Sequence, residues 1–310
     1  MQDLGIIGQF GKKLILLGMV TLLIACEGIV DAVKGNETAQ ILGLVLDQPC
    51  TLTSREGRRL AGAYLRRPII APLGFDLLFI NGRESRAGLP RSLIIDDTAL
   101  RRLKDRNEDD TLTGSHRSTA TLHAGFAPES TLPNVYALAY RANKIEYTGP
   151  LVVGPTMAEF EIPTSGSQTF AGRIDVSLFT QSPDGSPLSA TSTGTFEMST
   201  GYGEKRAHFT VSGLGADLPF ESLSWTNLYQ CGARLVSSGE GRVTTKSESN
   251  AATPPFQTDQ TPVPLNSMFE SSLFAPATRP ALPEKVGGTF VIQSDVGTIT
   301  GVFLSDVAGT

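Results

Sequence analysis

The sequence has little of the material from which metal and redox sites are made. It holds only three Cys, three His and one Trp among 310 residues. Neither His-x-x-x-His nor Cys-x-x-Cys occurs, so the common zinc patterns are missing. The serine-nucleophile patterns Gly-x-Ser-x-Gly and Ser-x-x-Lys are missing too. The sequence therefore predicts a protein that is not an enzyme, with no catalytic residue, no metal ion and no dissociable cofactor.

An excess of positive charge is also missing. There are 26 Lys and Arg against 31 Asp and Glu, which gives a formal net charge of -5. Nucleic acids are not expected as partners, because proteins that bind them carry a basic stripe or patch. Hydrophobic residues make up 40% of the chain and charged ones 18%, which excludes a wholly disordered chain. The 32 Gly and 19 Pro, without a long helical period, favour short strands and turns.

The chain begins with a pattern typical of export. Lys12 and Lys13 precede an uncharged, mostly apolar run, residues 14–25. The run is too short to span a membrane, which takes about 20 apolar residues, but it has the length of a secretory signal, about 7–15 residues. It ends in Leu23-Ile24-Ala25-Cys26, which resembles the lipobox of bacterial lipoproteins. Alternatives are an ordinary signal peptide with an incidental Cys, or a buried N-terminal helix.

The lipobox resemblance implies that Cys26 is lipidated. Residues 1–25 would be the signal peptide, and residues 26–49 the lipidated Cys and a tether. Cys26 would carry a diacylglycerol on its thiol and, after cleavage, an acyl chain such as palmitate on its amine, and two or more chains hold a protein stably at a membrane. Glu27 follows the Cys, where the inner-membrane retention signal has Asp. The predicted location is the outer membrane, on its cell-surface or periplasmic face.

Two other cysteines remain after the lipidated one. Cys50 and Cys231 lie in the early and late parts of the chain. An exported protein meets an oxidising compartment, where a disulfide between them would form and persist. The alternative is a pair of buried, inert thiols. Connectivity is not readable from sequence, so both remain open.

Residues 50–154 predict an irregular β-rich domain. The Asn81-Gly82 pair after an apolar run is a turn signal, because both residues tolerate positive φ. Residues 98–104 are the best candidate for a short helix, with Asp97 or Thr98 as its cap. Three tyrosines form a candidate binding stripe, although core and rim positions are favoured because the three do not all share strand parity: Tyr136, Tyr140 and Tyr147.

Residues 155–310 predict a barrel. Between Phe170 and Leu178 apolar residues alternate with polar ones, which is the period-two pattern of a strand with one wet face. Counting this one, the region contains some eight strands at regular spacing, which indicates an antiparallel sandwich or a closed barrel. A closed barrel is preferred because closure removes exposed strand edges. The fold class is therefore all-β, with an antiparallel eight-stranded C-terminal barrel after an irregular β-rich domain.

The last strands carry a family resemblance. The runs Met268–Pro276, Pro283–Phe290 and Gly301–Phe303 resemble the end of the barrel domain of transferrin-binding protein B and related bacterial surface lipoproteins. That family has an aromatic strand, a Glu-(Val/Ile/Leu)-Gly-Gly-x-Phe segment and a closing Gly-x-Phe strand. Here Ala275 stands at the turn Gly and Lys285 is inserted after Glu284. The resemblance covers about residues 155–306 and implies a handle-like domain in residues 50–154.

These residues also have a physical interpretation. Gly287 and Gly288 would let one backbone pass closely over another where the barrel turns, while Phe290 and Phe303 would fill its interior. The resemblance implies lipid-anchored, non-enzymatic capture of a host or environmental macromolecule, or of an iron- or haem-bearing ligand. The alternative is a periplasmic structural or assembly lipoprotein that contacts other envelope components.

The densest basic cluster lies at the start of the β-rich domain. It comprises Arg58, Arg59, Arg66 and Arg67, with Arg55 nearby. Such a cluster would meet acidic lipid headgroups, lipopolysaccharide or an acidic partner, and the alternative is a solvated face. The adjacent Asp96 and Asp97 would point to opposite faces of a strand, so they predict a loop rather than paired carboxylates.

Overall fold

The computed structural model describes eleven stretches of the chain. They are residues 59–70, 74–84, 90–102, 111–124, 132–157, 161–181, 187–238, 241–245, 267–275, 282–294 and 297–306. The predicted signal peptide, Cys26, the tether, Cys50 and Arg58 lie outside them. Seventeen strands and one 3₁₀ turn make up the secondary structure of the described residues, without an α-helix among them. The predicted all-β fold is confirmed.

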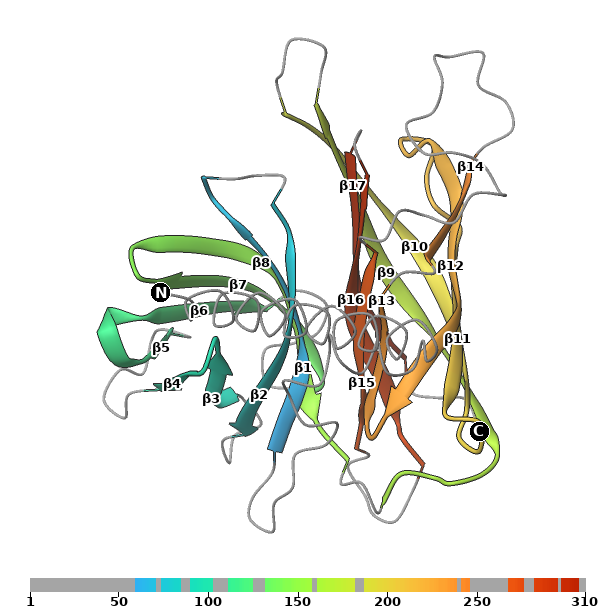
Figure 1. Cartoon of the computed structure of the whole chain (residues 1–310), viewed down its shortest axis with the longest axis horizontal. Helices are drawn as coiled ribbons and strands as arrows, with labels where there is room; N and C mark the ends of the chain where they lie inside the picture. Colours follow the sequence, from blue (N-terminus) through green and yellow to red (C-terminus); the bar gives the residue numbers. More distant parts are fainter. Residues whose placement is uncertain are drawn as a thin grey trace, which may run out of the picture. The chain divides into compact units, whose positions relative to one another are not determined.

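The first eight strands form a closed ring. Each pairs antiparallel with the next, and β8 pairs with β1 to close it (Figure 1). The strands are β1 (Arg59–Pro68), β2 (Asp76–Glu84), β3 (Pro90–Ile95), β4 (Thr98–Arg102), β5 (Thr111–Thr113), β6 (Thr119–Ala124), β7 (Asn134–Ala142) and β8 (Ile145–Pro155). The 3₁₀ turn η1 (Ser115–Arg117) joins β5 to β6. The region predicted to be irregular is thus itself a barrel.

Two local predictions in this region are wrong. The predicted helix from Thr98 is strand β4, because Asp96 and Asp97 adopt φ values of 47° and 58° and form a two-residue turn that pairs Ile95 with Thr98. Positive φ at both central residues is the geometry of a tight hairpin. The Asn81-Gly82 pair lies inside β2 and forms no turn.

The remaining strands close a second ring. They are β9 (Ser167–Gln181), β10 (Pro187–Gly201), β11 (Arg206–Ser212), β12 (Phe220–Cys231), β13 (Arg234–Ser238), β14 (Gly241–Thr245), β15 (Met268–Phe274), β16 (Lys285–Ser294) and β17 (Gly297–Ser305). β13 and β14 pair with successive parts of β12 and share one position in the ring. The pairs β11–β12 and β17–β9 close it. The predicted eight-stranded C-terminal barrel is confirmed.

Side chains fill both rings. In the larger barrel, alternate residues of β9 from Phe170 to Leu178 are buried, as the period-two pattern predicts. The ring of Phe209 lies 4.8 Å from that of Phe303 and 4.9 Å from that of Phe269, measured between centroids. The smaller barrel is filled by Leu, Ile and Tyr side chains, among them Tyr64, which is fully buried. The interiors of both barrels are therefore occupied, and accessible surface is left on their outer faces and rims.

The two barrels pack against each other within one compact unit. An apolar cluster joins Val135 and Val152 of the smaller barrel to Phe274 and Leu304 of the larger one. A Cβ on Gly287 would lie 2.8 Å from Val152 Cγ1, closer than real side chains approach. Glycine at this position therefore allows the close packing of the two barrels.

The other predicted barrel residues lie in the larger ring. A Cβ on Gly288 would lie 2.3 Å from the backbone oxygen of Glu270, so β15 and β16 approach closely at this point. Phe290 and Phe303 are both fully buried in the core of the larger barrel. All three residues therefore serve packing, and none of them faces a ligand from the outside.

Candidate functional site

Strand register gathers arginines on the outer face of the smaller barrel. Arg59 of β1 stands opposite Arg83 of β2, Arg83 stands opposite Ser92 of β3, and Ser92 stands opposite Arg101 of β4. Directly opposite residues point to the same face, with Cβ atoms about 5 Å apart. The neighbouring residues Leu60, Leu93 and Leu100 are fully buried, so the row itself faces outwards.

The row lines a pocket of about 480 Å³, which we call the arginine pocket. Its volume lies within the range of sites for small ligands, about 300–1,000 Å³. Its lining residues are Arg59, Asn81, Gly82, Arg83, Arg91, Ser92, Ile94, Ala99, Arg101 and Arg102. Five of these ten are arginines, which makes the pocket strongly electropositive.

Four of these guanidinium groups have no acidic partner within the described part of the chain. No Asp or Glu oxygen lies within 4.0 Å of Arg59, Arg83, Arg91 or Arg101 there. Partial burial and the facing charge of Arg83 both lower the pKa of Arg59. Like charges directly opposite one another destabilise a sheet, and a bound anion would relieve the repulsion. The arrangement thus favours binding of an anionic group.

Four other described arginines contact a carboxylate, which compensates their charge within the fold: Arg66, Arg141, Arg173 and Arg234. The described arginines outside the pocket without such a contact are spread over β1, η1, β11 and β14: Arg67, Arg117, Arg206 and Arg242. The arginine pocket therefore differs in that it brings several arginines without a carboxylate contact in the described stretches into one place.

The predicted basic cluster is not brought together by the structure. Arg59 lies at one end of β1, whereas Arg66 and Arg67 lie at the other. Arg66 hydrogen-bonds Asp76 at 2.8 Å, also contacts Asp96, and lies 4.6 Å from the ring centroid of Tyr147. Arg67 lies 5.1 Å from the ring centroid of Phe179 in the larger barrel. Only Arg59 of the described members belongs to the arginine pocket.

The tyrosines do not form a surface stripe. Tyr136 and Tyr140 are 3% and 1% exposed and lie in the core of the smaller barrel. Tyr140 stands opposite Tyr147, and their rings stack with centroids 6.0 Å apart. Burial raises the pKa of Tyr140, which is typical of a phenol in a core. These residues stabilise the barrel and offer nothing to a ligand on its outer face.

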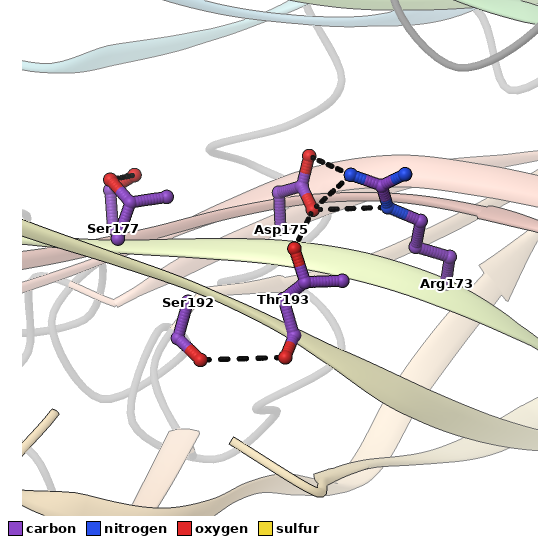
Figure 2. A network of polar contacts seen from close by, with 6 residues as sticks. Arg173, Asp175, Ser177, Ser192 and Thr193 are labelled. Atoms are coloured by element: carbon purple, nitrogen blue, oxygen red, sulfur yellow. Dashed lines mark hydrogen bonds and ion pairs between the residues drawn. The ribbon is translucent and has the colours of Figure 1, made fainter. Parts of the chain in front are cut away.

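A second polar cluster lies on the outer face of β9 and β10 (Figure 2). Asp175 accepts hydrogen bonds from Arg173 Nη2 at 3.1 Å and from Thr193 Oγ1 at 2.9 Å. The hydroxyl groups of Ser177 and Thr191 lie 3.0 Å apart. Because the charge of Asp175 is balanced by its own neighbours, the cluster fits a structural role that ties the two strands together.

Elsewhere in the described stretches, no group of three His, Cys, Asp or Glu is arranged to hold a metal ion. Nor do those stretches contain a helix long and apolar enough to cross a membrane. Cys231 is disulfide-bonded. Its predicted partner Cys50 lies outside the described residues, so this pairing stays a prediction, as does the lipid on Cys26.

No family model and no curated protein matches the chain. A transferrin-binding protein B mutant from Haemophilus parasuis is similar, with 16% identity and a TM-score of 0.43 over 81% of this chain and 45% of that one. The protein of the same name from Neisseria meningitidis shows 11% identity and a TM-score of 0.40 over 80% and 43%. A surface lipoprotein shows 11% identity and a TM-score of 0.37 over 81% and 99%. The chain spans less than half the length of the first two.

Proposed function

We propose that this chain is a lipid-anchored cell-envelope protein that captures a ligand without changing it chemically. The observation that carries the proposal is the arginine pocket on the outside of a barrel whose interior is filled. Arginine forks bind carboxylate and phosphate groups in pairs of strong hydrogen bonds. The ligand is a host or environmental macromolecule, or an iron- or haem-bearing ligand, that presents acidic groups to this pocket.

The pocket is tested by removing two of its charges. In the double variant Arg83→Gln, Arg101→Gln, we expect recovery of ligand to fall at least about tenfold in affinity capture, because each change removes a charge-assisted hydrogen bond. Capture is measured with the full-length protein on cells grown under iron limitation. The matched control is Arg141→Gln, Arg173→Gln, which removes the same charge from outside the pocket. Equal recovery by both double variants would contradict the proposal.

The anchor is tested at Cys26. In the variant Cys26→Ser we expect the protein to lose its covalent lipid and to move from the membrane fraction to the soluble fraction, because anchoring rests on acyl chains. Labelled palmitate and cell fractionation measure the two effects. Unchanged labelling and fractionation in the variant would disprove lipidation at this position.

The side of the outer membrane on which the protein lies distinguishes capture at the cell surface from a structural or assembly role in the periplasm. Digestion of the protein by protease added to intact cells supports capture at the surface. Full protection, together with recovery of envelope proteins alone in the capture experiment, would replace this proposal by a structural or assembly role in the periplasm.

A further inference from the structure

The arginine pocket indicates a narrower class of ligand than any macromolecule with an acidic surface. Resting on the capture role proposed above, we propose that the pocket binds a phosphorylated sugar. Phosphate oxygens would lie against the guanidinium groups of the row, and sugar hydroxyl groups against the neutral polar side chains between them. The argument has three parts: charge, neutral polar groups and an apolar patch.

The charge of the pocket favours phosphate over a single carboxylate. Arg59 and Arg83 face each other directly, and Arg101 lies two strands further along the same row. A phosphomonoester carries about -1.5 to -2 charges and three acceptor oxygens, so it compensates two facing guanidinium groups at once. A carboxylate carries one charge and two oxygens. The wider spacing to Arg101 suits a second phosphate on the same molecule.

The neutral polar groups favour a ligand that also has hydroxyl groups. Ser92 lies between Arg83 and Arg101 in the row. Asn81 also lines the pocket. Its side-chain amide can both donate and accept hydrogen bonds, as a sugar hydroxyl group can, whereas fully ionised phosphate only accepts them. A phosphosugar therefore matches both the guanidinium groups and these neutral polar side chains.

An apolar patch completes the pocket. Ile94 stands between Asn81 and Ala99 across the strands, and it is a large hydrophobic side chain with 43% exposure. The C–H face of a sugar ring is apolar enough to cover such a side chain, whereas inorganic phosphate is not. Across β2, β3 and β4, one row therefore carries the arginines, Arg83 and Arg101 with Ser92 between them. The next row carries polar Asn81 and apolar Ile94 and Ala99.

The proposal is tested by titration calorimetry on the full-length protein in detergent. The probes are glucose 1,6-bisphosphate, inorganic phosphate, glucose and a hexaglutamate peptide. We expect the sugar bisphosphate to bind at least about tenfold more tightly than phosphate, and glucose to give no measurable heat. Binding of hexaglutamate as tight as that of the sugar bisphosphate would overturn the proposal in favour of an acidic peptide.

Three variants locate the binding. Arg83→Gln with Arg101→Gln should weaken binding of the sugar bisphosphate at least about tenfold, and Arg141→Gln should leave it unchanged. Asn81→Ala should weaken binding of the sugar bisphosphate and leave phosphate binding unchanged, because only the sugar uses this side chain. Thermal melts followed by circular dichroism confirm that each variant is folded. Equal effects of Asn81→Ala on both probes would overturn the assignment of the hydroxyl contact.

A second experiment shows whether the sugar phosphate is a free molecule or the headgroup of a glycolipid. Vesicles of phosphatidylcholine with and without a bisphosphorylated glucosamine lipid are compared with the soluble sugar. Binding to lipid-containing vesicles alone assigns a glycolipid headgroup, and binding of the soluble sugar assigns a free ligand. If neither binds while arginine-dependent capture on cells persists, this inference fails and the capture role stands. Loss of the arginine dependence itself would remove the capture role.

Discussion

Replacing Arg234 by Met is expected to lower the free energy of unfolding by about 3–5 kcal/mol, because it leaves a buried charge without its partner. Arg234 of β13 and Glu270 of β15 are 3% and 6% exposed. Arg234 Nε donates to Glu270 Oε1 at 2.9 Å, and Nη2 donates to Oε2 at 2.7 Å. The guanidinium also lies 3.9 Å from the ring centroid of Phe79 in the smaller barrel. The pair therefore belongs to the contact between the barrels.

The effect of this substitution depends on pH in a defined direction. Burial raises the pKa of Glu270, and the charge and hydrogen bonds of Arg234 oppose that rise. Without Arg234 the pKa of folded Glu270 rises further, so the folded state of the variant takes up a proton that the unfolded state does not. Stability lost by the variant is therefore largest at neutral pH and is partly regained as pH falls towards the ordinary Glu pKa.

Urea denaturation of both proteins between about pH 7 and about pH 5 measures the loss and its pH dependence. The control is the double variant Arg234→Met, Glu270→Leu. Replacing both charges by apolar groups of similar size is often neutral or stabilising, so the double variant should be much more stable than Arg234→Met. A double variant as unstable as the single one would show that packing of the arginine side chain, and not its charge, holds this contact.

The larger barrel was predictable because each of its strands carries its own signal. In β9 the apolar residues from Phe170 to Leu178 alternate strictly, and one side of the strand faces a core that side chains fill. Closure follows from the need to cover edges, which is a property of sheets in general. Local pattern and global fold agree over this region, so sequence reasoning was sufficient there.

The smaller barrel was harder to predict because its strands are short and its turns are unusual. β4 and β5 have five and three residues, too few for a clear period of two. The turn between β3 and β4 uses Asp96 and Asp97, a less common pair in tight hairpins than Asn-Gly. The sequence of residues 98–104 therefore fits a capped helix as well as a strand. Only the pairing of β4 with β3 decides between the two.

The arginine pocket could not be found from neighbours in the sequence. Arg59, Arg83 and Arg101 come from three strands, and the register of the pairing from β1 to β4 brings them into one row. The predicted cluster relied on nearness along the chain, which placed Arg66 and Arg67 with Arg59 although they lie at the far end of the strand. The sequence does carry one signal for the outward direction of these side chains. Arg59 and Arg101 are each adjacent to a Leu that is buried, and adjacent residues of a strand point to opposite faces.

Truncating Trp225 to Ala is expected to lower the free energy of unfolding by about 3–5 kcal/mol, since a large aromatic side chain is lost from a filled core. Trp225 is 1% exposed, and its ring centroid lies 4.8 Å from that of Phe290 and 5.3 Å from that of Phe269. Gly241 stands opposite it, and a Cβ there would lie 2.9 Å from the indole ring. Gly241 of β14 thus leaves space that the side chain of Trp225 fills.

Two further variants separate packing from other effects of removing Trp225. Trp225→Phe should lose much less stability, because it keeps an aromatic ring and removes an indole N–H that has no acceptor among the described residues. Leu188→Ala, at a position with 52% exposure, should change stability by less than about 0.5 kcal/mol. Urea denaturation followed by circular dichroism measures all three. Below its unfolding transition, Trp225→Ala should still bind at the arginine pocket, because that pocket is built from β1 to β4 alone; loss of binding in the folded variant would show that the larger barrel takes part in holding the site.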